Sequence, residues 1–274
     1  SVFFRSVLSG EGDMKTPMII QGSGTVLNMI LDPIFIFYLD MGVEGAALAT
    51  VISQVIVTLI FIYFLFVKEH AYITFAMKDF KFSNSILQRI FKLGLPASFS
   101  LILMSFGSGI FNRILVTFSN DAVAAYQVGS RIDHLFIMPA ISISTSLVTL
   151  VGMFYGAKKI DALNQIVKYG ITRAFFITLI SSTFVYIFAE TFSAWFTQDQ
   201  EIIDVSVGFL RLLCIMYPFV AIAITAGRVM QGLGKGIPVL VITTVRVLGV
   251  SAPLALYFSF VLDKPVEWNW YAMM

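Results

Sequence analysis

Seven long apolar segments, each of about the length needed to cross a lipid bilayer, constrain the fold of this chain most strongly. A helix needs about 20 mostly apolar residues to span a membrane. The segments that meet this length are residues 17–39, 43–67, 93–118, 122–153, 169–190, 204–227 and 236–261. The alternating pattern of a membrane strand does not extend over any of them. We therefore predict an all-α, polytopic bundle of transmembrane helices.

The composition excludes a soluble fold. Of the 274 residues, 58% are hydrophobic and 12% are charged, whereas soluble domains average about 45–50% apolar and about 25% charged residues. The 18 Lys and Arg residues form no basic stripe, which excludes nucleic acid as a partner. The single cysteine, Cys214, excludes a disulfide framework and a cysteine-based metal site. The sequence also lacks zinc-protease and nucleotide-loop motifs, so we expect no cofactor.

Positive charge is distributed unequally between the two sets of loops that alternate along the chain. Cytoplasmic loops of membrane proteins carry an excess of Lys and Arg. Twelve of these residues fall in one set of loops, and the other set holds Lys264 alone. This distribution places residues 68–92 in the cytoplasm and residues 190–204 on the outer side. It predicts a multi-pass protein of the plasma (inner) membrane.

Residues 68–92 form the longest and most charged connection, and we interpret them as a cytoplasmic linker between two bundles. Ser83, followed by apolar residues at helical spacing, predicts a short helix over residues 82–92 on the inner membrane surface. Residues 1–9 are typical of the tail of an earlier span and residues 268–274 of the start of a later one, so we expect a fragment. The predicted domains are residues 1–67, 68–92 and 93–274.

A pattern of Arg, Gly-x-Gly and Pro occurs twice, each time at the inner end of an outward-running span. The residues of the first copy are Arg5, Gly10, Gly12 and Pro17, and those of the second are Arg228, Gly232, Gly234 and Pro238. Further along, Asp32-Pro33 and Ala252-Pro253 occupy corresponding places. Both copies run in the same direction, which predicts a parallel repeat about the membrane normal with a substrate path between the halves.

These residues and several other runs resemble the MATE family of multidrug exporters, in the DinF-like and archaeal branch of the MOP flippase superfamily. The matching runs include Asn28-Met-Ile-Leu-Asp32-Pro33, Gly42-Val-Glu-Gly-Ala-Ala-Leu-Ala-Thr50, Gly94-Leu-Pro96, Gly152-Met-Phe-Tyr-Gly-Ala-Lys-Lys159 and Gln231-Gly-Leu-Gly234. The resemblance implies two pseudo-symmetric six-helix lobes. Residues 1–67 would end the first, incomplete lobe (the end of span four, then spans five and six). Residues 93–274 would form spans seven to eleven and the start of span twelve. The resemblance also implies that Asn28, Asp32 and Thr50 belong to a cation site.

Asp32 is also the sharpest candidate on physical grounds, because a carboxylate inside an apolar span is costly and marks a functional site by default. Asn28 lies one helical turn earlier on the same helix face. Thr50 and Gln54 repeat this spacing on the next span. Because the hairpin turns near residue 41, Asp32 and Thr50 are predicted at one depth, and Asn28 and Gln54 one turn deeper.

Pro33 adds to this group, because a proline has no N–H to donate to the carbonyl of Met29. Carboxylate, amide, hydroxyl and carbonyl oxygens together predict a site for Na⁺ or H⁺ as the coupling ion. The alternative is a hydrogen-bonded clamp between helices with a purely structural role.

Charged residues also lie within the later spans. Arg131 and Asp133 stand next to His134, either as a neutralised pair that fixes helix packing or as a second protonation or substrate site. The other intramembrane arginines are Arg113, Arg211 and Arg246. Either these arginines snorkel or bond carbonyls freed by prolines, or they line a cavity that receives an anionic group.

The function that we predict is export of amphipathic organic compounds coupled to Na⁺ or H⁺, by alternating access between two lobes. The expected partners are a small amphipathic substrate and the lipid bilayer, and we expect a monomer. A flippase for lipid-linked oligosaccharides is the first alternative. An ion channel would need a polar pore with rings of like charge, and an enzyme would need a nucleophile or metal-ligand set, which the sequence does not show.

Overall fold

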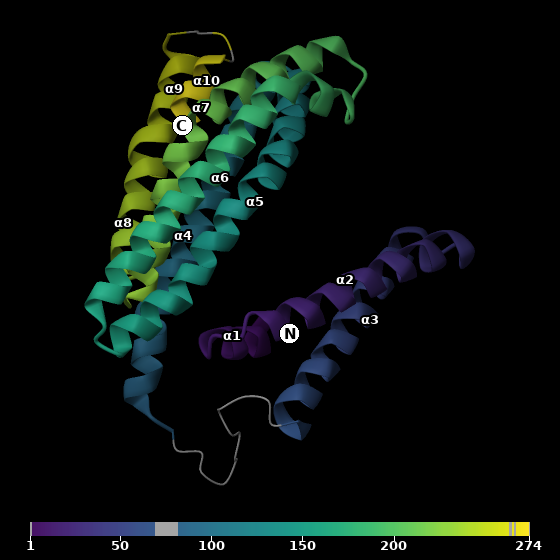
Figure 1. Ribbon diagram of the computed structural model, residues 1–274. Helices are drawn as coiled ribbons and strands as arrows, with labels where there is room; N and C mark the ends of the chain where they lie inside the picture. Colours follow the sequence, from purple (N-terminus) through teal and green to yellow (C-terminus); the bar gives the residue numbers. More distant parts are fainter. Residues whose placement is uncertain (1, 69–81, 263–264, 266, 274) are drawn as a thin grey trace. The chain divides into compact units, whose positions relative to one another are not determined.

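The computed structural model describes residues 2–68, 82–262, 265 and 267–273, and within them the chain is helical apart from turns and short connections (Figure 1). It divides into two compact units, Ser1–Phe82 and Ser83–Met274. The elements of the first unit are α1 (Val2–Gly10), α2 (Lys15–Pro33), η1 (Ile34–Tyr38), α3 (Gly42–Ile62) and η2 (Tyr63–Val67). Those of the second are α4 (Asn84–Val116), α5 (Asn120–Gly156), α6 (Ile160–Ala194), α7 (Gln200–Gly232), α8 (Ile237–Thr244), η4 (Val245–Ser251), α9 (Ala252–Phe260) and α10 (Glu267–Met273).

The described part of the chain contains seven helices that are long and apolar enough to span a membrane, which confirms the polytopic helical bundle. They are Lys15–Tyr38, Gly42–Val67, Asn84–Val116, Asn120–Gly156, Ile160–Ala194, Gln200–Gly232 and Ile237–Phe260. Large apolar side chains on their outer faces are exposed, such as Leu135 (65%), Ile180 (70%) and Phe219 (65%). Such apolar faces are typical of helices that lie in a membrane, where lipid or other membrane helices cover them.

The third of these helices begins nine residues before its predicted start, as the fifth also does. A separate short helix was expected over residues 82–92, but residues 84–92 form the first turns of the continuous helix α4. Gly94 and Pro96 do not end the helix, and the hydroxyl of Ser100 donates to the carbonyl oxygen of Pro96 at 2.8 Å. The two units meet in sequence between Phe82 and Ser83. The first part of the predicted linker, residues 69–81, lies outside the described residues.

In the first unit, α2 and α3 form an antiparallel hairpin, and α1 packs against both. Buried apolar side chains fill the space between these helices: Leu8, Ile20, Val57, Phe61 and Leu65. The helices approach closely at Gly24, where an added Cβ atom would clash with Cγ2 of Val57. Small residues at a crossing allow this approach of two membrane helices.

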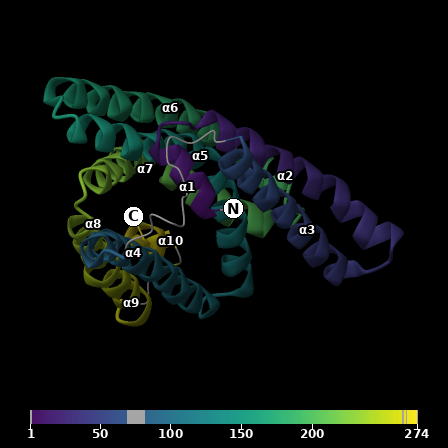
Figure 2. The same ribbon diagram turned by 90° about the horizontal axis from the view of Figure 1, so that it is seen from below.

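In the second unit, α5, α6 and α7 pack side by side, and α4 packs against α8, η4 and α9 (Figures 1 and 2). The core among α5, α6 and α7 includes Ile132, Val185, Leu210 and Tyr217. The short helix α10 packs along α9, and Trp270 is buried with Leu115, Tyr126 and Phe209. The second unit therefore contains five of the seven membrane-length helices.

The repeated Gly-x-Gly sequences form the same backbone turn. Gly12 (φ 92°) and Gly234 (φ 77°) both adopt the left-handed conformation just after a helix. In the first copy the N–H of Asp13 donates to the carbonyl of Leu8 at 3.1 Å, and in the second the N–H of Lys235 donates to the carbonyl of Met230 at 2.9 Å. This six-to-one hydrogen bond defines a Schellman motif. The repeat that the sequence predicts is thus present in the local backbone of both units.

Proline and π-helical turns also coincide in both copies. η1 follows Pro33 directly, and η4 ends two residues before Pro253. A proline cannot donate a hydrogen bond to the carbonyl four residues earlier, and the weakened ladder permits the wider π-turn. Both copies therefore have an irregular helix near the proline, after it in the first copy and before it in the second.

Candidate functional site

The side chains of Asn28, Asp32 and Thr50 form a continuous hydrogen-bonded group on the hairpin of the first unit. The amide Nδ2 of Asn28 donates to Oδ1 of Asp32 at 3.1 Å and lies 3.5 Å from Oγ1 of Thr50. The hydroxyl of Thr50 in turn donates to the carbonyl oxygen of Ala46 at 2.9 Å. Both protons of one amide are therefore directed at oxygen atoms on two different helices.

Helical spacing on α2 and close packing of α2 against α3 position these side chains. Asn28 and Asp32 are one turn apart on α2, which puts them on one face of the helix. Close packing at Gly24 and at Gly45 brings α3 near enough for Thr50 to be reached; a Cβ atom at Gly45 would lie 2.6 Å from the carbonyl oxygen of Phe35. In the described chain Asn28 and Asp32 are half-buried, whereas Thr50 is exposed.

The fourth predicted member, Gln54, stands one turn from Thr50 on α3. The sequence predicts Asn28 at the depth of Gln54, and in the structure the amide of Asn28 is directed at Thr50. Thr50 and Gln54 both line a shallow recess of about 370 Å³ on the surface of α3. The structure thus brings Asn28, Asp32 and Thr50 together, with Gln54 at the edge of the group.

The chemistry of the group suits a small cation. Since the amide of Asn28 uses its N–H groups as donors, its own carbonyl oxygen is directed elsewhere and can accept or coordinate. The second carboxylate oxygen of Asp32 adds a charged ligand of the type that hard cations prefer. Among the described residues no cluster of three or more His, Cys, Asp or Glu side chains could hold a metal ion. A cation here would thus use one carboxylate together with neutral oxygens.

The candidate charged residues of the second unit are distributed over three helical elements. Arg131 and Asp133 are on α5, Arg211 is on α7 and Arg246 is in η4. Asp133 is half-buried, and the three arginines are exposed. Within the described ranges, no hydrogen bond or ion pair joins any two of them, so they do not form one assembled site like that around Asp32.

Two contacts of these helices were not predicted from the sequence. The guanidinium carbon of Arg211 lies 5.5 Å from the centre of the Tyr186 ring, which is a cation–π contact between α7 and α6. The amide of Gln127 donates to Oδ1 of Asn112 at 3.1 Å, and this bond links α5 to α4. The second could have been found by the same hairpin arithmetic, because residues 112 and 127 are equidistant from a turn near residue 119.

A polar contact inside the second unit was also missed. Tyr217 is 1% exposed, and its hydroxyl has no hydrogen bond of good geometry within the described residues. The side chain of Asp133 lies close enough to interact with it electrostatically. Cys214, one turn before Tyr217 on α7, is a buried free thiol. These residues form a partly polar group beside the packed core of α5, α6 and α7 rather than a closed hydrogen-bond network.

Comparison with known proteins identifies the class. The MatE family model matches residues 96–257, which is more than half of the chain. The chain therefore belongs to the MATE family of the MOP superfamily, whose members are multi-pass transporters of the cytoplasmic membrane and not enzymes.

Relatives of known sequence support this assignment. The chain is 28% identical over 256 residues to a probable multidrug resistance protein, NorM, of Thermotoga maritima, a match that covers 92% of this chain and 55% of that protein. It is 30% identical over 210 residues to the multidrug export protein MepA of Staphylococcus aureus, covering 77% of this chain and 46% of that protein. The chain thus spans about half the length of these relatives.

The fold agrees with that of a solved transporter. A MOP superfamily transporter from Pyrococcus furiosus superposes with a TM-score of 0.94 at 31% sequence identity, over 98% of this chain and 61% of that protein. Its binding pocket is described as having reverse polarity, which was taken to suggest a different function for that protein.

Proposed function

We propose that this chain is part of a secondary antiporter that exports amphipathic organic compounds in exchange for Na⁺ or H⁺. Membership of the MATE family and similarity to multidrug exporters support transport of drug-like molecules. The observation that carries the coupling is the group of Asn28, Asp32 and Thr50, in which one amide joins a carboxylate to a neighbouring helix.

The group offers a direct way for a cation to alter helix contacts. The amide of Asn28, on α2, donates a hydrogen bond to Asp32 on the same helix and is also directed at Thr50 on α3. A proton or Na⁺ at Asp32 shares the carboxylate with this amide, so binding changes the link between the two helices. The π-turn η1 begins two residues after Asp32, where the backbone ladder is already irregular. Cation occupancy would thus favour one of two hairpin arrangements, as alternating access requires.

The decisive experiment uses the full-length protein that contains this chain, reconstituted into vesicles. Uptake of a fluorescent organic cation is measured under an imposed pH or Na⁺ gradient for wild type and Asp32→Asn. Asn is nearly the same size as Asp, so we expect a folded protein whose gradient-driven uptake falls to background. Asp161→Asn, at an exposed carboxylate in the first turn of α6, is the matched control and should leave uptake unchanged. Wild-type uptake and unchanged ion dependence in Asp32→Asn would refute the proposed coupling.

The exposed arginines of the second unit favour a second candidate, transport of substrates with an acidic or phosphate group, as in a lipid-linked oligosaccharide flippase. Arg131, Arg211 and Arg246 lie on membrane helices without an ion-pair partner in the described ranges. Arg binds carboxylate and phosphate groups by paired hydrogen bonds. Binding of matched anionic and cationic amphiphiles to wild type, Arg211→Gln and Arg246→Gln separates the candidates. Selective loss of anionic binding supports this candidate, and equal binding throughout excludes it.

A further inference from the structure

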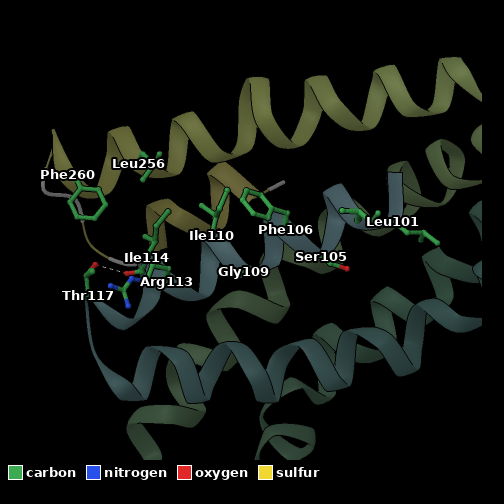
Figure 3. Close-up of a pocket in the computed structure, with 11 residues that line it drawn as sticks. Leu101, Ser105, Phe106, Gly109, Ile110, Arg113, Ile114, Thr117, Leu256 and Phe260 are labelled. Carbon is green, nitrogen blue, oxygen red and sulfur yellow. Dashed lines mark hydrogen bonds between the residues drawn. The ribbon is translucent and has the colours of Figure 1, made fainter. Parts of the chain in front are cut away.

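A long apolar groove with one positive charge near its end lies between α4 and α9. Its volume is about 990 Å³, at the upper end of the roughly 300–1,000 Å³ that is typical of ligand pockets. Six of its lining residues define its shape (Figure 3): Leu101, Phe106, Gly109, Arg113, Leu256 and Phe260. Three of these apolar side chains are strongly exposed, namely Leu101 (65%), Phe106 (63%) and Phe260 (62%).

The groove is open because of a glycine. A Cβ atom at Gly109 would meet no described atom within 4 Å, so the groove floor is empty at this position. Above and below it, Phe106 and Arg113 lie about one turn away on the same face of α4 (Figure 3). The groove therefore has room for a slender chain along the helix.

Arg113 makes one end of the groove positively charged, whereas the other end is apolar. It lies three residues before the last residue of α4, Val116. In the described part of the chain Arg113 forms no hydrogen bond or ion pair. The distribution of Lys and Arg places this end of α4 at the outer membrane surface. The guanidinium is thus near the depth of lipid head groups, where it can bind phosphate.

The length of the groove matches one leaflet. Twelve residues separate Arg113 from Leu101, which corresponds to roughly 18 Å along a helix rising about 1.5 Å per residue. One leaflet contributes about half of the roughly 30 Å hydrocarbon thickness of a bilayer. An acyl chain whose head group lies at Arg113 would therefore reach the level of Leu101.

We propose that the groove between α4 and α9 binds a phospholipid of the outer leaflet, with its phosphate at Arg113 and an acyl chain along Gly109 and Phe106. The charge and the apolar lining select a phosphate-bearing amphiphile over a neutral one. This site lies entirely within the second unit and does not depend on the Asp32 group.

The test uses the full-length protein in mild detergent, with added phosphatidylglycerol counted by native mass spectrometry. We expect one retained lipid in wild type. In Arg113→Gln the affinity for this lipid should fall by about tenfold or more, since hydrogen bonds to charged groups are stronger than those between neutral groups. Gly109→Leu places a side chain in the groove at a position where its Cβ atom would meet no described atom within 4 Å, and it should reduce retention comparably. The matched controls are Arg173→Gln, an exposed arginine on α6, and Gly208→Leu, a glycine on α7 with similar open space; both should bind as wild type.

Every outcome is informative. Reduced retention in both groove variants and in neither control supports the site. Wild-type retention in either groove variant overturns it. Absence of a retained lipid in the wild-type protein, as expected if another helix of the full-length protein covers the groove, also overturns it. Elution profiles in size-exclusion chromatography identify a variant that fails to fold, and Arg113→Lys then replaces Arg113→Gln, with a smaller loss expected because Lys cannot form the bidentate pair.

Discussion

Residues 5–38 and residues 228–260 are the two copies of the repeat. They share a backbone frame of glycine turns and prolines, but their net charges have opposite signs. Each begins with a Schellman turn at a left-handed glycine, and each contains a π-turn near a proline, after Pro33 in the first copy and before Pro253 in the second. The first copy then carries Asp32 with the amide of Asn28 directed at it. In the second, Ala252 stands at the place of Asp32, and Arg246 lies in the π-turn.

The comparison shows that the frame and the chemistry of this repeat are separable. Glycine and proline are required by the backbone at a turn or a broken ladder, so their positions follow from geometry. Side chains on the face of the helix are under no such constraint. One copy can therefore hold a cation while the other faces an anion or lipid, and similarity of fold alone does not reveal which.

The largest difference between the copies should follow from removing Asn28. Asn28→Ala deletes the amide that joins Asp32 to Thr50, and we expect gradient-driven transport to fall by about 10–100-fold, as for lost supporting groups around bound ions. The corresponding change in the second copy, Leu248→Ala, should leave the ion dependence of transport unchanged. Equal loss in both variants would indicate that the two copies contribute alike to coupling.

A packing difference is the next in size. An added Cβ atom at Gly232 would lie 2.8 Å from the carbonyl oxygen of Val148 on α5, whereas one at Gly10 would meet no described atom within 4 Å. We expect Gly232→Ala to destabilise by about 1–3 kcal/mol, because a backbone oxygen cannot easily move away. Gly10→Ala should be neutral or stabilising. Thermal denaturation of the two variants in detergent measures the difference, and similar melting temperatures would contradict it.

The shared turn should respond equally in the two copies. Gly12→Ala and Gly234→Ala each place a Cβ atom in the left-handed region, at a cost of about 1–2 kcal/mol. Because the hydrogen-bond pattern is the same, we expect losses that agree within experimental error in the same denaturation assay. A loss in one copy alone would show that the two turns are not equivalent.

The smallest effect concerns a third inner turn, after α5, where Lys158 has a left-handed φ of 57°. The N–H of Lys159 donates to the carbonyl of Phe154 at 3.0 Å, as in the two glycine turns. Lys158→Gly removes the strain but increases the freedom of the unfolded chain, so we expect a net gain of roughly 0.5 kcal/mol. A lower melting temperature would indicate that the lysine side chain stabilises this turn by another contact.

Much of the fold was predictable, because the length and apolarity of a membrane helix are properties of the sequence itself. The predicted limits of the second span, for example, differ from those of the observed helix Gly42–Val67 by one residue at the start. The continuous helix over residues 84–116 was not predicted, because Gly94 and Pro96 favour a break that the surrounding helices override. The π-turns were likewise missed, since local spacing does not show how a weakened ladder rearranges.

The candidate site was predictable where it depends on one helix and less so where it depends on two. The spacing of Asn28 and Asp32 required only helical periodicity, and their hydrogen bond follows from it. The contact of Asn28 with Thr50 on α3 depends on how the two helices are rotated, which the predicted depths of these residues do not specify. The contact of Arg211 with Tyr186 and the groove at Gly109 depend on packing in the same way.

Our central proposal is that Asp32 couples a cation to transport. The measurement is the flux of Na⁺ and of H⁺ across vesicles that contain the full-length protein, recorded when a transported substrate is added. We predict that wild type moves one of these cations in exchange for substrate. Asp32→Asn should bind substrate but move neither cation. Substrate-driven cation flux of wild-type size in Asp32→Asn would contradict the account.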